Sequence, residues 1–190
     1  MIEKYIHTKN FNKLNYEEKA LTKGEYDHCA FIECNFTKAD LSGINFIECT
    51  FELCNFSLAS LKTASLNEVK FLDCKLLGVK FNECNEFLLS LHFENCDLNL
   101  ASFYDLKLKS TPFINCNLKE VDFAGSDLSY STFDKCDLTR AIFENTNLEH
   151  TNFLTSYNYT LDPEKNDIQK AKFSQDGISG LLDKYNIVID

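Results

Sequence analysis

Residues 96–153 read CDLNL ASFYD LKLKS TPFIN CNLKE VDFAG SDLSY STFDK CDLTR AIFEN TNLEH TNF, and a leucine or phenylalanine stands third in every group of five. The same period runs back to Tyr26, with one interruption between Phe81 and Phe93. The residue two positions before each large apolar residue is usually Cys, Ala, Ser or Thr. A period of five fits neither a strand nor a helix, so each unit must be a short straight segment followed by a corner, with both positions facing inward.

The number of corners per coil follows from which residues would stack. With 20 residues per coil, Phe31 lies under Phe51 and Phe71, and the column continues through Phe93 and Phe113 if two residues are inserted after Phe81. A coil of fifteen residues would mix phenylalanine and leucine in one column. Each coil would hydrogen-bond to the next at about 4.8 Å and bury its apolar face only against its neighbours. The sequence therefore predicts an all-β, quadrilateral β-helix with four sides.

Several runs carry a family resemblance. ADLSGINF, CDLNLASF, GSDLSYSTF, CDLTRAIF and NTNLEHTNF resemble the A(D/N)LXX consensus of pentapeptide-repeat proteins, over about residues 26–155. The resemblance implies a right-handed β-helix. Asp or Asn before the central leucine is expected to satisfy backbone groups at the corners, as at Asp40, Asp97, Asp127 and Asp137.

The period divides the chain into three parts. Residues 1–25 are expected to form an N-terminal cap or an irregular first coil, residues 26–155 the repeat, and residues 156–190 a C-terminal cap with a short helix near Ile178 to Tyr185 and an extended end. A two-residue insertion falls within residues 82–92. It is interpreted as a bulge or corner loop, with a protruding recognition loop as the alternative.

The net charge of the chain is −10, and residues 24–160 carry the imbalance, with twenty Asp and Glu against ten Lys and Arg. An acidic surface disfavours direct contact with nucleic acid and anionic membranes and favours basic partners. No stretch reaches the roughly 18 apolar residues needed to span a bilayer, and the N-terminus lacks the apolar region of a secretory signal. These features predict a cytoplasmic protein with reduced thiols.

Catalytic, cofactor and metal sites are not expected. Eight of the nine cysteines occupy the inward small-residue position, where cysteine acts as a compact hydrophobe, and no CxxC pair occurs. The four histidines are scattered, without HExxH or a carboxylate partner at metal spacing, and are expected on the solvated surface: His7, His28, His92 and His150.

Function is left between two interpretations. The resemblance extends to the quinolone-resistance and gyrase-protecting pentapeptide-repeat proteins, and it implies an acidic rod that mimics DNA and binds DNA gyrase or topoisomerase IV. The alternative is a protein-interaction scaffold with another partner. For mimicry, outward acidic residues of the later coils are the candidate contacts: Asp122, Asp127, Asp134, Asp137, Glu144 and Glu149.

A homodimer is also expected from the resemblance, because relatives use a C-terminal helix and strand to associate head to head. The candidate dimerisation residues are the apolar ones of the C-terminal segment: Ile178, Leu181, Leu182, Ile187 and Ile189.

Overall fold

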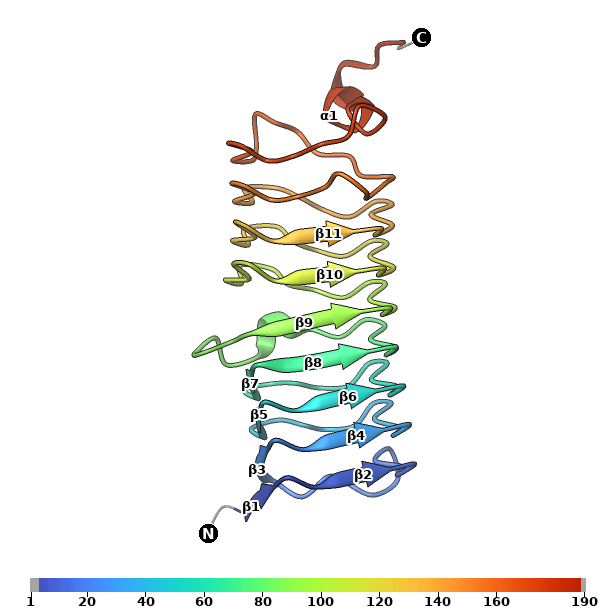
Figure 1. Ribbon diagram of the computed structural model, residues 1–190, viewed down its shortest axis with the longest axis vertical. Coiled ribbons are helices and arrows are strands. Elements are labelled where there is room, and N and C mark those ends of the chain that lie inside the picture. The colour runs from blue at the N-terminus through green and yellow to red at the C-terminus, as the bar shows by residue number, and fades with distance from the viewer. Residues whose placement is uncertain (1–3, 189–190) are drawn as a thin grey trace.

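The computed structural model describes residues 4–188 and forms a parallel β-solenoid that climbs one coil at a time from the N-terminus to the C-terminus (Figure 1). The strands nearest the viewer all run from left to right while the chain rises, so the coil is right-handed. The predicted fold class is confirmed.

Strands occupy two adjacent sides of the coil, and all of their pairings are parallel. One sheet contains β1 (Lys4–His7), β3 (Gly24–Asp27), β5 (Asn45–Ile47) and β7 (Ser65–Asn67), in that order. The other has seven strands, in the order β2 (Asn10–Asn12), β4 (Ala30–Ile32), β6 (Thr50–Glu52), β8 (Val69–Leu72), β9 (Leu91–Glu94), β10 (Pro112–Ile114) and β11 (Thr132–Asp134). Isolated parallel bridges, such as Asn35 to Asn55 and Asp122 to Ile142, join the coils on the remaining two sides.

We number the four sides by the inward column that each carries. Side 1, the seven-stranded sheet, carries Phe31, Phe51, Phe71, Phe93, Phe113, Phe133 and Phe153. Side 2 carries Phe36, Phe56, Leu76, Leu98, Leu118 and Leu138, and side 3 carries Leu41, Leu61, Phe81, Phe103, Phe123 and Phe143. Side 4, which begins as the four-stranded sheet, carries Tyr26, Phe46, Leu66, Leu108, Leu128 and Leu148.

The core is a set of stacked rings inside this tube. Along side 1, successive rings lie nearly parallel, with centroids 4.8 Å apart for Phe31 and Phe51 and 4.9 Å for Phe113 and Phe133. The first coil joins the same stack, because Phe11 lies 4.6 Å from Phe31. Each ring also meets a neighbouring side edge to face, as Phe113 does with Phe103. Both arrangements are favourable for aromatic pairs, so the predicted columns form one continuous core.

Left-handed residues make the corners. Non-glycine residues with φ between 49° and 61° recur through the rod, and at Lys38 the amide of the next residue, Ala39, donates to the Phe36 carbonyl at 2.9 Å. Side chains complete these corners as predicted. The Asp40, Asp97, Asp127 and Asp137 carboxylates each accept a hydrogen bond from the backbone amide two residues later.

The register of the stack changes once. Ser65 pairs with Asn85, twenty residues later, whereas Val69 pairs with Leu91, twenty-two residues later. The two additional residues lie in the segment between these pairs, Glu86–Ser90, which follows the 3-10 turn η1 (Phe81–Glu83) and leaves side 4. The four-stranded sheet ends at β7 for this reason, while the sheet of side 1 continues.

The C-terminal end carries the short helix α1 (Ser179–Leu182), followed by the 3-10 turn η2 (Asp183–Tyr185), which together match the helix expected near Ile178 to Tyr185. The Leu161 amide donates to the Gly180 carbonyl at 3.1 Å, and Lys184 pairs with Asp162 at 2.7 Å. These contacts hold α1 over the last coil. Within residues 4–188, the helices are all too short to cross a membrane.

Candidate functional surfaces

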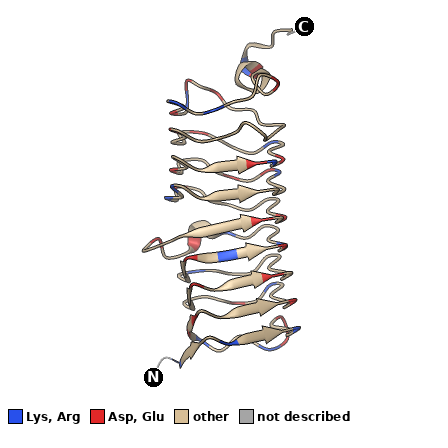
Figure 2. Ribbon diagram, in the orientation of Figure 1, with Lys and Arg blue, Asp and Glu red and all other residues tan. Residues whose placement is uncertain are grey.

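Acidic side chains cover two adjacent sides of the N-terminal half. Between residues 24 and 95, sides 4 and 1 carry nine carboxylates and one lysine, Lys70, and none of the ten is buried. We call this set the N-terminal acidic surface: Glu25, Asp27, Glu33, Glu48, Glu52, Glu68, Asp73, Glu86 and Glu94. Figure 2 shows acidic segments at strand ends and corners of these coils, with a basic segment inside β8.

The opposite sides of the same coils carry more lysines than carboxylates. Sides 2 and 3 between residues 34 and 83 carry the carboxylates Asp40 and Glu83 against four lysines, Lys38, Lys62, Lys75 and Lys80. The N-terminal half of the rod is therefore strongly one-sided in charge.

The six predicted acidic residues do not lie on one surface. Asp122 and Glu144 lie on side 3 and Asp137 on side 2, where they join the neighbouring carboxylates Asp97, Asp105 and Glu120. Asp134 lies on side 1, and Asp127 and Glu149 lie on side 4, among Lys107, Lys109 and Lys135. The later coils thus spread their charge over all four sides.

Several of these carboxylates also have structural partners. Asp122 accepts a hydrogen bond from the Ala124 amide at 3.0 Å, and Asp134 accepts one from Thr155 Oγ1 at 2.7 Å. Asp137 is the most engaged, because it binds the Thr139 amide and hydroxyl and Lys119 Nζ. Hydrogen bonds from Thr139 hold the pKa of Asp137 below its usual value against the opposing effect of burial.

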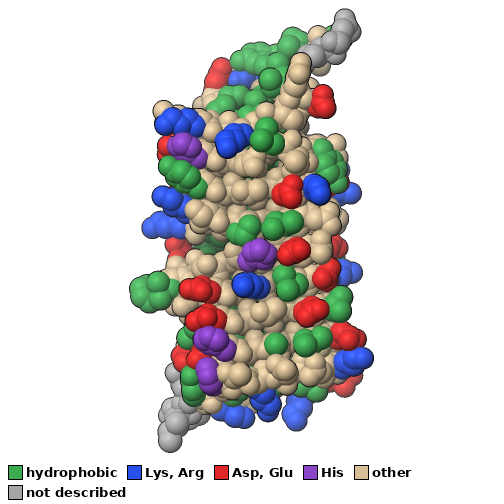
Figure 3. Space-filling model, viewed as in Figure 1, with side chains coloured by type: hydrophobic (Ala, Val, Ile, Leu, Met, Phe, Trp, Pro, Cys, Tyr) green, Lys and Arg blue, Asp and Glu red, His purple; other side chains and the backbone are tan. Residues whose placement is uncertain are grey.

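The insertion carries the most exposed large aromatic side chain of the rod. Phe87 is 74% exposed and its neighbour Leu88 59% exposed. A shallow groove of about 530 Å³ lies beside them, lined in part by Leu89, His92 and Lys109. Figure 3 shows an apolar projection standing out from one edge of the rod at mid-height.

Two histidines and an aspartate meet near the N-terminus. His7 and His28 each direct Nδ1 at the Asp27 carboxylate, at 3.0 and 2.6 Å, and Tyr5 donates its hydroxyl to the same carboxylate at 2.7 Å. The hydrogen bonds from Tyr5 and His28 lower the pKa of Asp27 to about 2, and Asp27 in turn raises the pKa of His28. The expectation of four scattered histidines is therefore wrong for two of them.

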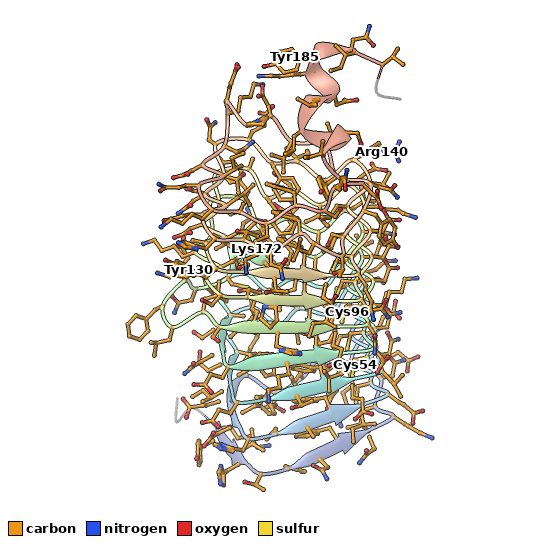
Figure 4. All side chains as sticks on the ribbon, turned by 45° about the horizontal axis from the view of Figure 1, so that its top comes forward. Cys54, Cys96, Tyr130, Arg140, Lys172 and Tyr185 are labelled. Atoms are coloured by element: carbon orange, nitrogen blue, oxygen red, sulfur yellow. The ribbon has the colours of Figure 1, made fainter. Side chains whose placement is uncertain are left out.

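All nine cysteines are buried free thiols, as the small-residue position predicts. Six of them form one column at a corner beside side 2, where Figure 4 labels Cys54 and Cys96: Cys34, Cys54, Cys74, Cys96, Cys116 and Cys136. Five of the six thiols donate to carbonyls of the coil below, as Cys74 Sγ does to Phe51 at 3.3 Å, and Cys116 donates to Ile114 of its own coil. Burial raises the pKa of Cys49 and Cys84 to about 12, which keeps these thiols protonated and unreactive.

The predicted dimerisation residues divide into two groups. Ile178 and Ile187 are exposed, whereas Leu181 and Leu182 are half-buried, and Leu181 packs against the core. Ile187 and its neighbour Val188 lie in no strand, and Ile189 is outside the described residues.

The chain is similar to known proteins in its repeat sequence and in its fold. The chain matches the family model for the pentapeptide repeat region over residues 25–86 and 79–173. No curated protein sequence matches it significantly. Among solved structures, it is similar to a trypsin-treated form of QnrB1, a plasmid-mediated fluoroquinolone resistance protein, with 20% identity, a TM-score of 0.59, and coverage of 98% of this chain and 92% of that one.

It is also similar to HetL, a pentapeptide-repeat protein involved in heterocyst differentiation regulation from the cyanobacterium Nostoc sp., with 15% identity, a TM-score of 0.56, and coverage of 89% of this chain and 86% of that one. At these identities the likeness concerns the fold alone. The family model, the twenty-residue coil and the inward columns agree, and the chain belongs to the pentapeptide-repeat family.

Proposed function

We propose that this protein is a non-catalytic binding rod that occupies the basic, DNA-binding surface of a type II topoisomerase, DNA gyrase or topoisomerase IV. The observation that carries the proposal is the N-terminal acidic surface, nine carboxylates against one lysine on two adjacent sides. The fluoroquinolone-resistance role of QnrB1, which has the same fold, supports the choice of partner.

The charge density of this surface is close to that of DNA. The nine carboxylates and Lys70 occupy four coils, which at about 4.8 Å each span about 19 Å. One net negative charge therefore falls every ~2.4 Å along the rod, against one per about 1.7 Å of axis in double-stranded DNA. A basic groove built to attract phosphates would attract this surface by the same long-range field.

A scaffold with a different partner is the second candidate, and the loop favours it. Phe87 and Leu88 project from the rod and offer an apolar anchor that electrostatic mimicry does not need. The regulatory role of HetL is an example of this fold in a different context.

The test is a gyrase supercoiling assay with purified protein, with and without a fluoroquinolone, at two salt concentrations. The expected result is inhibition or drug protection that weakens as salt rises, because exposed charges are screened. The variant Glu52→Lys/Glu68→Lys/Glu94→Lys should weaken the effect by about tenfold or more, since it reverses three charges of the acidic surface.

A matched control reverses three charges in the later coils, with Glu120→Lys/Glu144→Lys/Glu149→Lys. It should keep most of the activity. If the control abolishes activity and the first variant does not, the binding surface lies in the later coils. If neither changes it but Phe87→Ala/Leu88→Ala does, the loop is the anchor and the scaffold function is preferred.

We further propose a homodimer through the exposed apolar residues at the C-terminal end, Ile178 and Ile187. Light scattering of the purified protein should give twice the chain mass, and Ile178→Glu/Ile187→Glu should give the chain mass while leaving the β-helix intact by circular dichroism. A monomeric wild-type protein would refute the association.

A further inference from the structure

Three potential metal ligands converge on one corner at the N-terminal end of the rod. One ring nitrogen of His7, one ring nitrogen of His28 and one carboxylate oxygen of Asp27 all lie within 4.8 Å of one another. The two imidazole rings have centroids 5.5 Å apart and are tilted by 65°, so they approach the carboxylate from different directions. Figure 3 shows histidine and acidic side chains gathered near this end of the molecule.

The coil geometry brings these residues together. His7 ends β1 and Asp27 ends β3, and the two are direct partners in the parallel ladder. His28 follows in the left-handed conformation, with φ of 51°, which turns the chain at the corner. One histidine thus comes from the first coil, and the aspartate and the second histidine come from the coil above it.

The donor set selects the class of ion. Two imidazoles and one carboxylate suit Zn²⁺ and similar late transition metals, whereas Mg²⁺ and Ca²⁺ prefer oxygen ligands alone. Zn²⁺ holds such ligands at about 2.0–2.2 Å in tetrahedral sites, which sets the ligand atoms about 3.3 Å apart. His7 Nδ1 lies 3.0 Å from one oxygen of Asp27 and His28 Nδ1 lies 2.6 Å from the other, so these distances would have to open by about 0.3 and 0.7 Å to reach that spacing.

Neighbouring groups already orient the ligands. The Tyr5 hydroxyl donates to Asp27, and the far ring nitrogen of His28, Nε2, lies 3.0 Å from the Glu48 carboxylate. A carboxylate on the far nitrogen keeps a proton there, so that a metal can replace the proton that Nδ1 shares with Asp27. The side chains of His7 and His28 are 51% and 49% exposed, so an ion can enter from solvent.

The other two histidines provide an internal comparison. His92 has one carboxylate neighbour, Glu94, at 3.7 Å, and His150 has Glu149 at 3.5 Å. Among the described residues, His7, Asp27 and His28 form the one group of three potential ligands.

We propose that His7, Asp27 and His28 form a binding site for one divalent transition-metal ion, Zn²⁺ or a close relative, with a fourth position for water. The ion joins β1 to β3. Because β1 is the end strand of its sheet and its residues are largely exposed, this bond holds the N-terminal coil to the rod. Among residues 4–188, β1 pairs in its sheet with β3 alone, so metal binding would strengthen the attachment of this end strand.

The test uses full-length protein without a histidine tag, freed of metal by a chelator. Titration with Co²⁺ should produce visible absorption bands of a tetrahedral ion that saturate at one equivalent, and Zn²⁺ should abolish them. The variants His7→Gln and His28→Gln should each weaken Zn²⁺ affinity at least tenfold in competition with a chromogenic chelator. His92→Gln and His150→Gln are the matched controls and should bind as the wild type does.

Amide hydrogen exchange tests separately whether the ion holds β1 to β3. Zn²⁺ should slow exchange in β1 and leave β10 unchanged, and His28→Gln should lose this protection. Circular dichroism checks that the variants fold as the wild type does. Wild-type protein that gives no Co²⁺ bands, or His7 and His28 variants that bind as tightly as the controls, would overturn the proposal.

Discussion

Replacing Phe113 with alanine should lower the free energy of unfolding by about 4 kcal/mol, in the middle of the usual range of about 3–5 kcal/mol for a buried phenylalanine. The Phe113 ring is fully buried at mid-rod. It stacks between Phe93, at 5.2 Å, and Phe133, at 4.9 Å, and meets Phe103 and Phe123 edge to face at 5.8 and 5.7 Å. All four neighbours lose a contact face when the ring is removed.

The cavity left by this substitution should persist, because the ladders above and below fix the spacing of the coils. Phe113→Leu should cost much less, about 1.5 kcal/mol, since leucine fills the equivalent inward position elsewhere on sides 2 to 4. Tyr104→Ala, at an outward position that is 53% exposed, serves as the surface control and should change stability by less than about 0.5 kcal/mol.

The assay is equilibrium unfolding in urea, followed by circular dichroism and by tyrosine fluorescence. Coincident transitions from the two probes establish that the rod unfolds as one unit, which a stack of repeats does not guarantee. A loss of less than 1–2 kcal/mol for Phe113→Ala, with unchanged m-value, would refute the view that the ring stack is a rigid core.

Three further predictions concern the cap and the thiols. Gly180→Ala should detach α1, because the added Cβ would lie 2.0 Å from the Tyr159 carbonyl oxygen. The expected result is faster amide hydrogen exchange in α1 with unchanged exchange in the rod. Exchange in α1 as slow as in the wild type would contradict this prediction. The cap should also loosen in acid, because Lys184 holds the pKa values of Asp162 and Glu164 below their ordinary values. The stabilisation from these two ion pairs is complete at neutral pH and is lost as pH falls through the lowered pKa values. Limited proteolysis across the pH range should show faster cleavage of the cap in acid, and cleavage independent of pH would argue against the prediction. Ellman's reagent should find no fast-reacting thiol in the native protein and nine after denaturation, and rapid native labelling would show that the cysteine column is open to solvent.

Much of the fold could be predicted because one rule repeats. The inward positions are set by the period of five and the stacking by the period of twenty, so Phe31, Phe51 and Phe71 could be placed over one another from their numbers alone. The same numbers also assign every outward residue to a side. Sorting the charges by side locates the N-terminal acidic surface, whereas the predicted contacts Asp122 and Asp127 of the later coils lie on different sides.

The histidine cluster was hidden for a different reason. His7 and Asp27 are separated by twenty residues, one full coil, but the first coil lacks the small inward residues of the later units, and the sequence predicts only an N-terminal cap or an irregular first coil there. Its pairing with β3 became evident only from the backbone register. His28 required a second piece of information, because the period of five places it at a corner but does not by itself give the left-handed φ that decides where its ring lies.

The register change beside Glu86 has a consequence for how such a chain can evolve in length. Each coil contacts only the coil above and the coil below, so gaining or losing a whole coil of twenty residues leaves every column intact and alters the rod only in its height. A duplication of any other size cannot be absorbed by the core. The two surplus residues before Leu91 lie at the surface, in the loop that carries Phe87. Insertions that are not whole coils are therefore expected to form surface loops, whereas whole coils change only the length of the rod.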